Sequence, residues 1–125
     1  MTKIIAFPTD DGKTISSHLG QARYFQVIRL EDGKILDNEM RAKVSHTHQE
    51  HSPDESNQAH PGKAMFETIR DCQVLIAGGM GKPAFERAKS MGMEVYLTGE
   101  KYIDVAMQAY QAGTLDTDMR RVHVH

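Results

Sequence analysis

The sequence contains a single cysteine, no tryptophan, and only four phenylalanine and four tyrosine residues among its 125 residues. One cysteine, Cys72, cannot form an internal disulfide, which agrees with a reducing compartment, and we expect a cytoplasmic protein. The amino-terminal residues MTKIIAFPTDDG lack the apolar region of a signal peptide. No apolar run approaches the length that spans a membrane. Secreted, disulfide-rich and membrane-spanning classes are therefore disfavoured.

An excess of positive charge is also missing. Fifteen Lys and Arg residues face 17 Asp and Glu residues, so the formal net charge is −2 at pH 7, and the basic residues are scattered. A nucleic-acid-binding domain is expected to concentrate basic residues on one face, so this class is disfavoured. The length suits one domain over residues 1–125, with one hydrophobic core and a flexible histidine-rich segment at 45–62.

The most informative stretch is Cys72–Pro83, CQVLIAGGMGKP. Val74–Ala77 is a short apolar run that predicts a strand buried on both faces, and Pro83–Met91 has helical spacing. The glycine-rich turn between them, Gly78–Gly81, allows close approach to the backbone and marks a candidate binding site. The alternative is that these glycines only make a tight turn. Their spacing fits neither a Walker loop nor a dinucleotide-binding fingerprint.

The remaining elements follow from apolar patterning and turn residues. Further strands are expected over Lys3–Phe7, which Pro8 would end, and over Tyr24–Leu30, Ile35–Val44 and Glu94–Thr98. Further helices are expected over Lys63–Arg70 and Ile103–Ala112. The first three strands are joined by short turns and predict an antiparallel meander, whereas the later strands are separated by helices and predict parallel pairing. An α/β fold with a five-stranded mixed sheet of order 3-2-1-4-5 and helices on both faces satisfies both rules. This is a ribonuclease H-like arrangement.

This connectivity brings the unusual stretches to one edge of the sheet. The turn at Asp10, the segment around His18, the histidine-rich segment and the Gly78–Gly81 turn all lie at the same strand ends. Ligands of open α/β sheets bind beyond the carboxyl ends of parallel strands. We therefore expect the functional site at this edge.

Catalytic chemistry is poorly supported there. A metal-dependent nuclease or phosphotransferase needs converging carboxylates, but Asp10 and Asp11 are adjacent in one turn and point apart. Cys72 begins a buried strand, where a cysteine usually serves as a small hydrophobic residue. We therefore predict a protein that is not an enzyme.

Histidine is abundant for this length. Of seven histidines, four fall close together in the chain: His46, His48, His51 and His60. The spacing of His46, His48 and His51 allows a folded loop to surround a metal that prefers imidazole, and His18 is a further candidate ligand. No cysteines accompany them, so a closed structural zinc site is disfavoured and open ligation of a metal or metal cluster is the sharper hypothesis. A polar loop that merely contains histidine is the alternative.

Two stretches resemble a known family. His18–Phe25 (HLGQARYF) and Asp71–Gly81 (DCQVLIAGGMG) are similar to two boxes of the NifX/NifB-type dinitrogenase iron–molybdenum cofactor biosynthesis domains, in the right order. The resemblance implies a ribonuclease H-like fold that binds, without turnover, an iron–sulfur or iron–molybdenum cluster precursor. It also implies metallocluster donor or acceptor proteins as partners and a connection with nitrogen fixation.

The resemblance also indicates site residues. Those that match the two boxes are His18, Gly20, Arg23 and Tyr24 in the first, and Gly78, Gly79, Met80 and Gly81 in the second. Gln21 departs from the pattern, because members often carry a second histidine there. The histidine-rich segment falls where the family varies, so its metal role depends on spacing alone. Two other readings stay open: a small regulatory or partner-binding module without a cluster, and a simple zinc or nickel binder that uses the histidine-rich segment.

Overall fold

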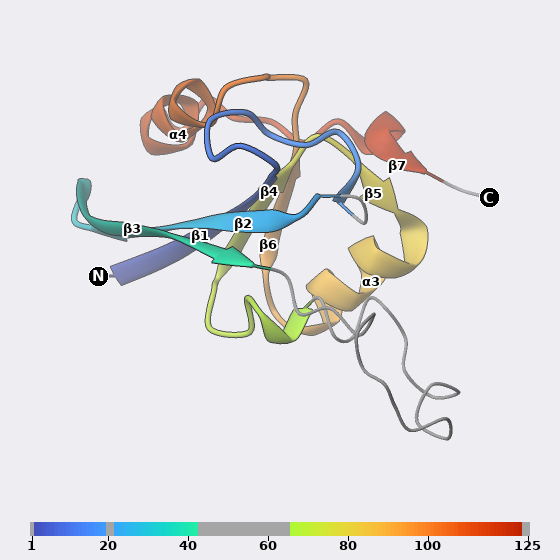
Figure 1. Cartoon of the computed structure of the whole chain (residues 1–125). Coiled ribbons are helices and arrows are strands. Elements are labelled where there is room, and N and C mark those ends of the chain that lie inside the picture. Colours follow the sequence, from blue (N-terminus) through green and yellow to red (C-terminus); the bar gives the residue numbers. More distant parts are fainter. Residues whose placement is uncertain (1, 20–21, 43–65, 124–125) are drawn as a thin grey trace, which may run out of the picture.

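The computed structural model describes residues 2–19, 22–42 and 66–123 (Figure 1). The main sheet contains β1 (Thr2–Thr9), β2 (Tyr24–Glu31), β3 (Lys34–Ala42), β4 (Val74–Ala77) and β6 (Glu94–Leu97). Two short strands, β5 (Met80–Gly81) and β7 (Val122–His123), form a separate parallel pair. The helices are α3 (Lys82–Ser90), α4 (Ile103–Ala112) and the 3₁₀ helix η2 (Met119–Arg121).

The main sheet is mixed, with the strand order β3-β2-β1-β4-β6. β1 and β2, and β2 and β3, pair in antiparallel fashion, whereas β4 pairs in parallel with both β1 and β6. The fold is therefore α/β with a five-stranded mixed sheet. The expected order 3-2-1-4-5 differs from this order in its last strand, because a short additional strand, β5, precedes the strand that was expected as the fifth. The glycine turn after β4 does not lead directly into a helix but first forms β5, which lies outside the main sheet.

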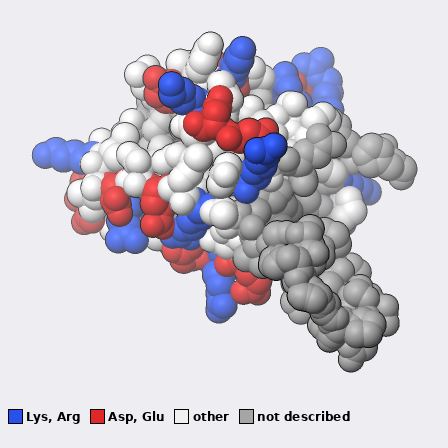
Figure 2. All heavy atoms as spheres, viewed as in Figure 1, with Lys and Arg blue, Asp and Glu red and all other residues white. Residues whose placement is uncertain are grey.

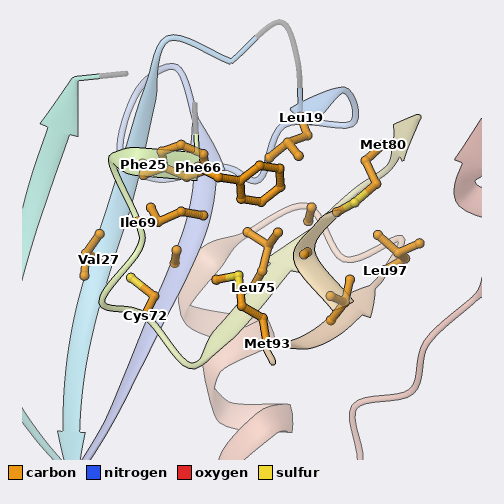
Figure 3. Close-up of a cluster of buried hydrophobic side chains, with 14 residues drawn as sticks. Leu19, Phe25, Val27, Phe66, Ile69, Cys72, Leu75, Met80, Met93 and Leu97 are labelled. Carbon is orange, nitrogen blue, oxygen red and sulfur yellow. The ribbon is translucent and has the colours of Figure 1, made fainter. Parts of the chain in front are cut away.

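The two faces of the sheet carry separate halves of the core. Along β1, Ile5 and Phe7 belong to one buried cluster while Ala6 belongs to the other, as expected when successive side chains point to opposite faces. α4 covers the first face with Ile103 and Met107. The second face holds the cluster drawn in Figure 3, which α3 covers with Ala88 and the turn after residue 66 covers with Phe66 and Ile69.

We predicted that Pro8 would end the first strand. In the structure, Pro8 instead lies inside β1, opposite Phe25. The carbonyl oxygen of Pro8 accepts a hydrogen bond from the Ser16 N–H at 2.8 Å, so this residue presents its polar groups away from β2. The missing N–H of proline therefore removes no bond between the two strands. The strand continues for one residue beyond Pro8 and ends at Thr9, at the sheet edge.

The turn between β2 and β3 follows the prediction. Asp32 and Gly33 both have positive φ, 51° and 84°, which is the geometry of the tight hairpin turn that an Asp-Gly step favours. β3 is largely exposed: the apolar side chains Ile35 and Leu36 are 51% and 57% exposed. Only Arg41 within β3 is partly buried, because β3 is the edge strand of the sheet.

Several expectations concern residues outside the described ranges: the histidine-rich segment at 45–62, the end of the predicted strand Ile35–Val44, and the start of the helix over Lys63–Arg70. Of that helix, residues 66–67 are helical and residues 68–71 form a turn. Among the helices that the structure describes, none is long and apolar enough to cross a membrane.

Candidate ligand site at the carboxyl edge of the sheet

Backbone hydrogen bonds join the segment around His18 to the glycine turn after β4. The Gly78 N–H donates to the Ser16 carbonyl oxygen at 3.0 Å, and the Leu19 N–H donates to the Gly79 carbonyl oxygen at 3.0 Å. The Leu19 side chain is fully buried in the core cluster beneath. The two stretches that the sequence analysis singled out therefore form one continuous structure at the carboxyl ends of β1 and β4.

Gly78 has no space for a side chain. A Cβ atom placed on Gly78 would lie 2.8 Å from both the carbonyl oxygen of Ser16 and the Cα of Ser17, and both atoms belong to the backbone. Glycine therefore lets the two loops approach each other closely. The Gly78 N–H is already bonded to Ser16, so it is not one of the ligand donors that we expected at this turn.

His18 lies on the surface beside this junction. The Ser16 hydroxyl donates to the His18 carbonyl oxygen at 3.0 Å and accepts from the His18 N–H at 3.1 Å, which fixes the backbone of the loop. The side chain is exposed. It borders a depression of about 410 Å³ that is lined by Ser17, His18, Gly78, Asp118, Arg120 and Arg121.

Three of these six residues, Asp118, Arg120 and Arg121, come from the C-terminal segment. The Asp118 N–H donates to the Leu97 carbonyl oxygen at 2.9 Å, so the segment starts its turn at the end of β6. η2 follows, and β7 then pairs with β5. The sequence does contain a clue, because the basic pair Arg120–Arg121 directly precedes a Val-His alternation, a pattern compatible with an edge strand.

The other predicted site residues do not line this depression. The Met80 side chain is 1% exposed and belongs to the core cluster of Figure 3, so Met80 contributes no side chain to a surface ligand. Arg23 is exposed, and its N–H donates to the Asp10 Oδ1 at 2.9 Å. Gly81 is the N-cap of α3 and lies in β5. Gly20 and the histidines His46, His48 and His51 lie outside the described residues.

The two adjacent carboxylates are used within the structure. Asp10 holds the backbone of Arg23, as described above, while Asp11 accepts from the Lys13 and Thr14 N–H groups, each at 2.9 Å. These hydrogen bonds to Asp11 stabilise its charged form and lower its pKa well below the usual range. Asp11 therefore stabilises its own turn, whereas Asp10 ties this turn to the residue that precedes β2.

The described residues contain no group of three His, Cys, Asp or Glu side chains placed to hold a metal ion. The depression instead offers one imidazole, two guanidinium groups and a hydroxyl, against one carboxylate. On the face shown in Figure 2, Lys and Arg alternate with Asp and Glu without a large field of one sign. Such a donor set fits an anion held by charge and hydrogen bonds, with His18 as a single ligand for a metal.

The family model described as "Dinitrogenase iron-molybdenum cofactor" matches residues 1–113, which include both boxes and every strand of the main sheet. The chain belongs to this family. The family match ends before Asp118, Arg120 and Arg121, so half of the residues that line the depression come from outside the region shared with the family. A search of curated proteins found no match to this sequence.

Solved structures share the fold of this family member. The crystal structure of a candidate dinitrogenase from Methanocaldococcus jannaschii has 13% identity and a TM-score of 0.68, covering 94% of this chain and 96% of that chain. The apo orange protein from Desulfovibrio gigas has 18% identity and a TM-score of 0.70, covering 93% and 92%. The NMR structure of a candidate NifB protein from Thermotoga has 21% identity and a TM-score of 0.64, covering 92% of each chain. At these identities the likeness concerns the fold.

Proposed function

We propose that this protein is a carrier that binds, without turnover, an anionic iron–sulfur or iron–molybdenum cluster precursor at the carboxyl edge of its sheet. The single observation that supports this most is the position of the exposed His18 beside a depression lined by Arg120 and Arg121. The family match supports the class of cargo, because the family is described by the iron–molybdenum cofactor of dinitrogenase.

The physical argument concerns charge and exchange. Sulfide-bridged metal clusters are commonly anionic, and guanidinium groups and N–H or O–H donors bind anions through charge-assisted hydrogen bonds. His18 supplies one exchangeable ligand, since an imidazole nitrogen suits iron and other borderline metals. A site with one ligand and several hydrogen-bond donors holds a cluster without enclosing it. Delivery to an acceptor protein then requires the loss of one metal–nitrogen bond only.

The edge of the sheet is also where a partner protein would reach the cargo. The depression is open to solvent on the surface, and His18 and Arg120 are exposed. We therefore propose metallocluster donor and acceptor proteins as the partners. Among the described residues, Asp10 is bonded to the Arg23 backbone, Asp11 is bonded within its turn, and Cys72 is buried, so none of these three side chains is available as a reactive group at the site. Binding without catalysis is accordingly the proposed activity.

The test is anaerobic incubation of the full chain with iron and sulfide, or with a preformed cluster, followed by gel filtration. Visible absorption and metal analysis of the protein fraction then report uptake. The proposal predicts a charge-transfer band and stoichiometric metal that stay with the protein. A colourless, metal-free protein with its fold intact would contradict the proposal and would favour a regulatory or partner-binding module.

A further inference from the structure

The C-terminal segment holds Arg121 in an unusual environment. The Arg121 N–H donates to the Asp118 carbonyl oxygen at 3.0 Å, and the next residue begins β7, so the backbone is fixed on both sides. The guanidinium group lies against Gly99: a Cβ atom placed there would be 2.5 Å from the Arg121 Nη2. Gly99 therefore provides the space that Arg121 occupies.

The hydrogen-bonding capacity of Arg121 is largely unused by the described part of the chain. Its Nη1 makes one long hydrogen bond, 3.4 Å, to the Gly78 carbonyl oxygen. Its Nε is buried and makes no hydrogen bond, although the Asp118 Oδ2 lies 3.7 Å away. A guanidinium group has five N–H donors, and burying donors without acceptors costs free energy. The side chain is still 38% exposed, so its outer donors are accessible from the depression.

The one carboxylate among the residues that line the depression, Asp118, is bonded mainly to Arg120. The Asp118 Oδ1 and Oδ2 accept from the Nε and Nη2 of Arg120 at 2.9 and 3.1 Å, which is a bidentate pair. Asp118 also caps η2, because its Oδ1 accepts from the Arg120 N–H at 3.0 Å. Asp118 is therefore shared by two guanidinium groups, Arg120 at hydrogen-bond distance and Arg121 at 3.7 Å, so the three side chains together leave one net positive charge for a ligand.

We infer that Arg121, with Ser17 and His18 on the facing loop, forms a binding site for a compact inorganic anion of tetrahedral geometry. Donors contributed by separate segments suit an anion whose acceptor atoms point in several directions better than a planar carboxylate. The inference rests on the proposed function for its role, because the same charge recognition would hold the anionic cargo. It makes Arg121, which lies beyond the family match, the residue that selects anions in this chain.

The experiment titrates the full chain with sulfate, phosphate and molybdate at low ionic strength. Isothermal titration calorimetry gives the affinity, and amide NMR locates the binding through the Gly78, Ser17 and Arg121 signals. Wild-type protein is expected to bind at least one of these anions with shifts confined to those residues. Arg121→Gln is expected to weaken binding by about tenfold to a hundredfold, because one charge-assisted interaction is lost.

Two further variants make the test specific. Gly99→Ala keeps every charge but pushes the Arg121 guanidinium out of its place, so it should also weaken anion binding by about tenfold if the position of the guanidinium matters. Arg29→Gln removes the same charge from an exposed position on β2 and should leave the affinity unchanged. Amide NMR of each variant shows whether the fold is retained.

Anion binding by wild-type protein that Arg121→Gln and Gly99→Ala leave unchanged would overturn the inference, as would the absence of binding for all three anions. These results are separable from cluster uptake. A protein that takes up a cluster but binds no simple anion keeps the proposed function and loses this inference. A protein that binds the anions through Arg121 but takes up no cluster keeps this inference and loses the proposed function.

Discussion

The amide nitrogen of Gly78 and the carbonyl oxygen of Ser16 lie 3.0 Å apart and form the hydrogen bond that joins the loop after β1 to the glycine turn after β4. These residues are separated by the whole of β2, β3 and the segment that follows them. The bond places His18 next to the end of β4, where the C-terminal segment arrives. The candidate site therefore depends on this contact more than on any single ligand.

Gly78→Ala should destabilise the protein by about 1–3 kcal/mol, the usual cost of overpacking a closely fitted site. The added Cβ would meet two backbone atoms at 2.8 Å, and neither can rotate away as a side-chain tip would. Urea denaturation followed by circular dichroism measures the change. Gly99→Ala is the matched control, since its Cβ meets only the end of the Arg121 side chain, and we expect a smaller loss of stability. Equal losses in the two variants would contradict this account.

The sequence contains enough information to predict the main elements near this contact. Val74–Ala77 and Ile103–Ala112 have the predicted bounds, because a short apolar run and an amphipathic pattern with a closing glycine are strong local features. β5 could not be predicted in the same way. Its two residues pair with β7 from the far end of the chain, and such pairing leaves no local pattern.

The site itself was predictable only in part. His18 and Gly78 follow from the two boxes, whereas Asp118, Arg120 and Arg121 reach the depression because the Asp118 N–H bonds to Leu97. A contact between residues 21 positions apart in sequence, made through one backbone hydrogen bond, has no signature in composition or periodicity. The ribonuclease H-like classification and the roles of His46, His48 and His51 stay predictions.

The thiol of Cys72 should be unreactive in the native protein. Cys72 is 6% exposed within the core cluster, and burial raises the pKa of its thiol to about 12, with the nearby Asp71 carboxylate adding to the effect. Nucleophilic attack requires the thiolate, so a disulfide exchange reagent at pH 8 is expected to react only after denaturation. Rapid stoichiometric labelling under native conditions would show that the thiol is accessible and would contradict its role as a core residue.

Arg41 and Asp71 should make the fold more sensitive to acid. The Arg41 Nη1 donates to the Asp71 Oδ1 at 2.7 Å and to the Thr68 carbonyl oxygen at 2.9 Å, so it ties β3 to the turn before β4. Hydrogen bonding to Arg41 lowers the pKa of Asp71 in the folded state. The resulting stability is fully present above the unfolded-state pKa of about 3.9 and is lost as the pH falls through the lowered folded-state pKa.

Asp71→Asn tests this linkage. The Asp71 side chain is 46% exposed, so solvent screening limits the expected loss to about 1 kcal/mol or less at pH 7. The variant should also lose less stability than wild type between about pH 5 and pH 2, because the Asp71 carboxyl of the wild-type protein takes up its proton in this range. Glu67→Gln is the control, because its pair with Arg70 is more exposed on both sides. A steeper acid transition in Asp71→Asn than in wild type would reverse the assigned sign.

The cluster affinity of His18→Ala shows whether His18 belongs to the site that holds the cluster. The side chain is exposed, so the variant should fold with unchanged stability. Equilibrium dialysis against a preformed cluster under anaerobic conditions, with metal analysis of the protein, should show affinity reduced by at least about tenfold, since even the loss of an outer-shell partner of a metal ligand costs that much. Lys34→Ala, an exposed substitution at the opposite end of the sheet, should bind like wild type. Equal affinity in His18→Ala and wild type would contradict the account.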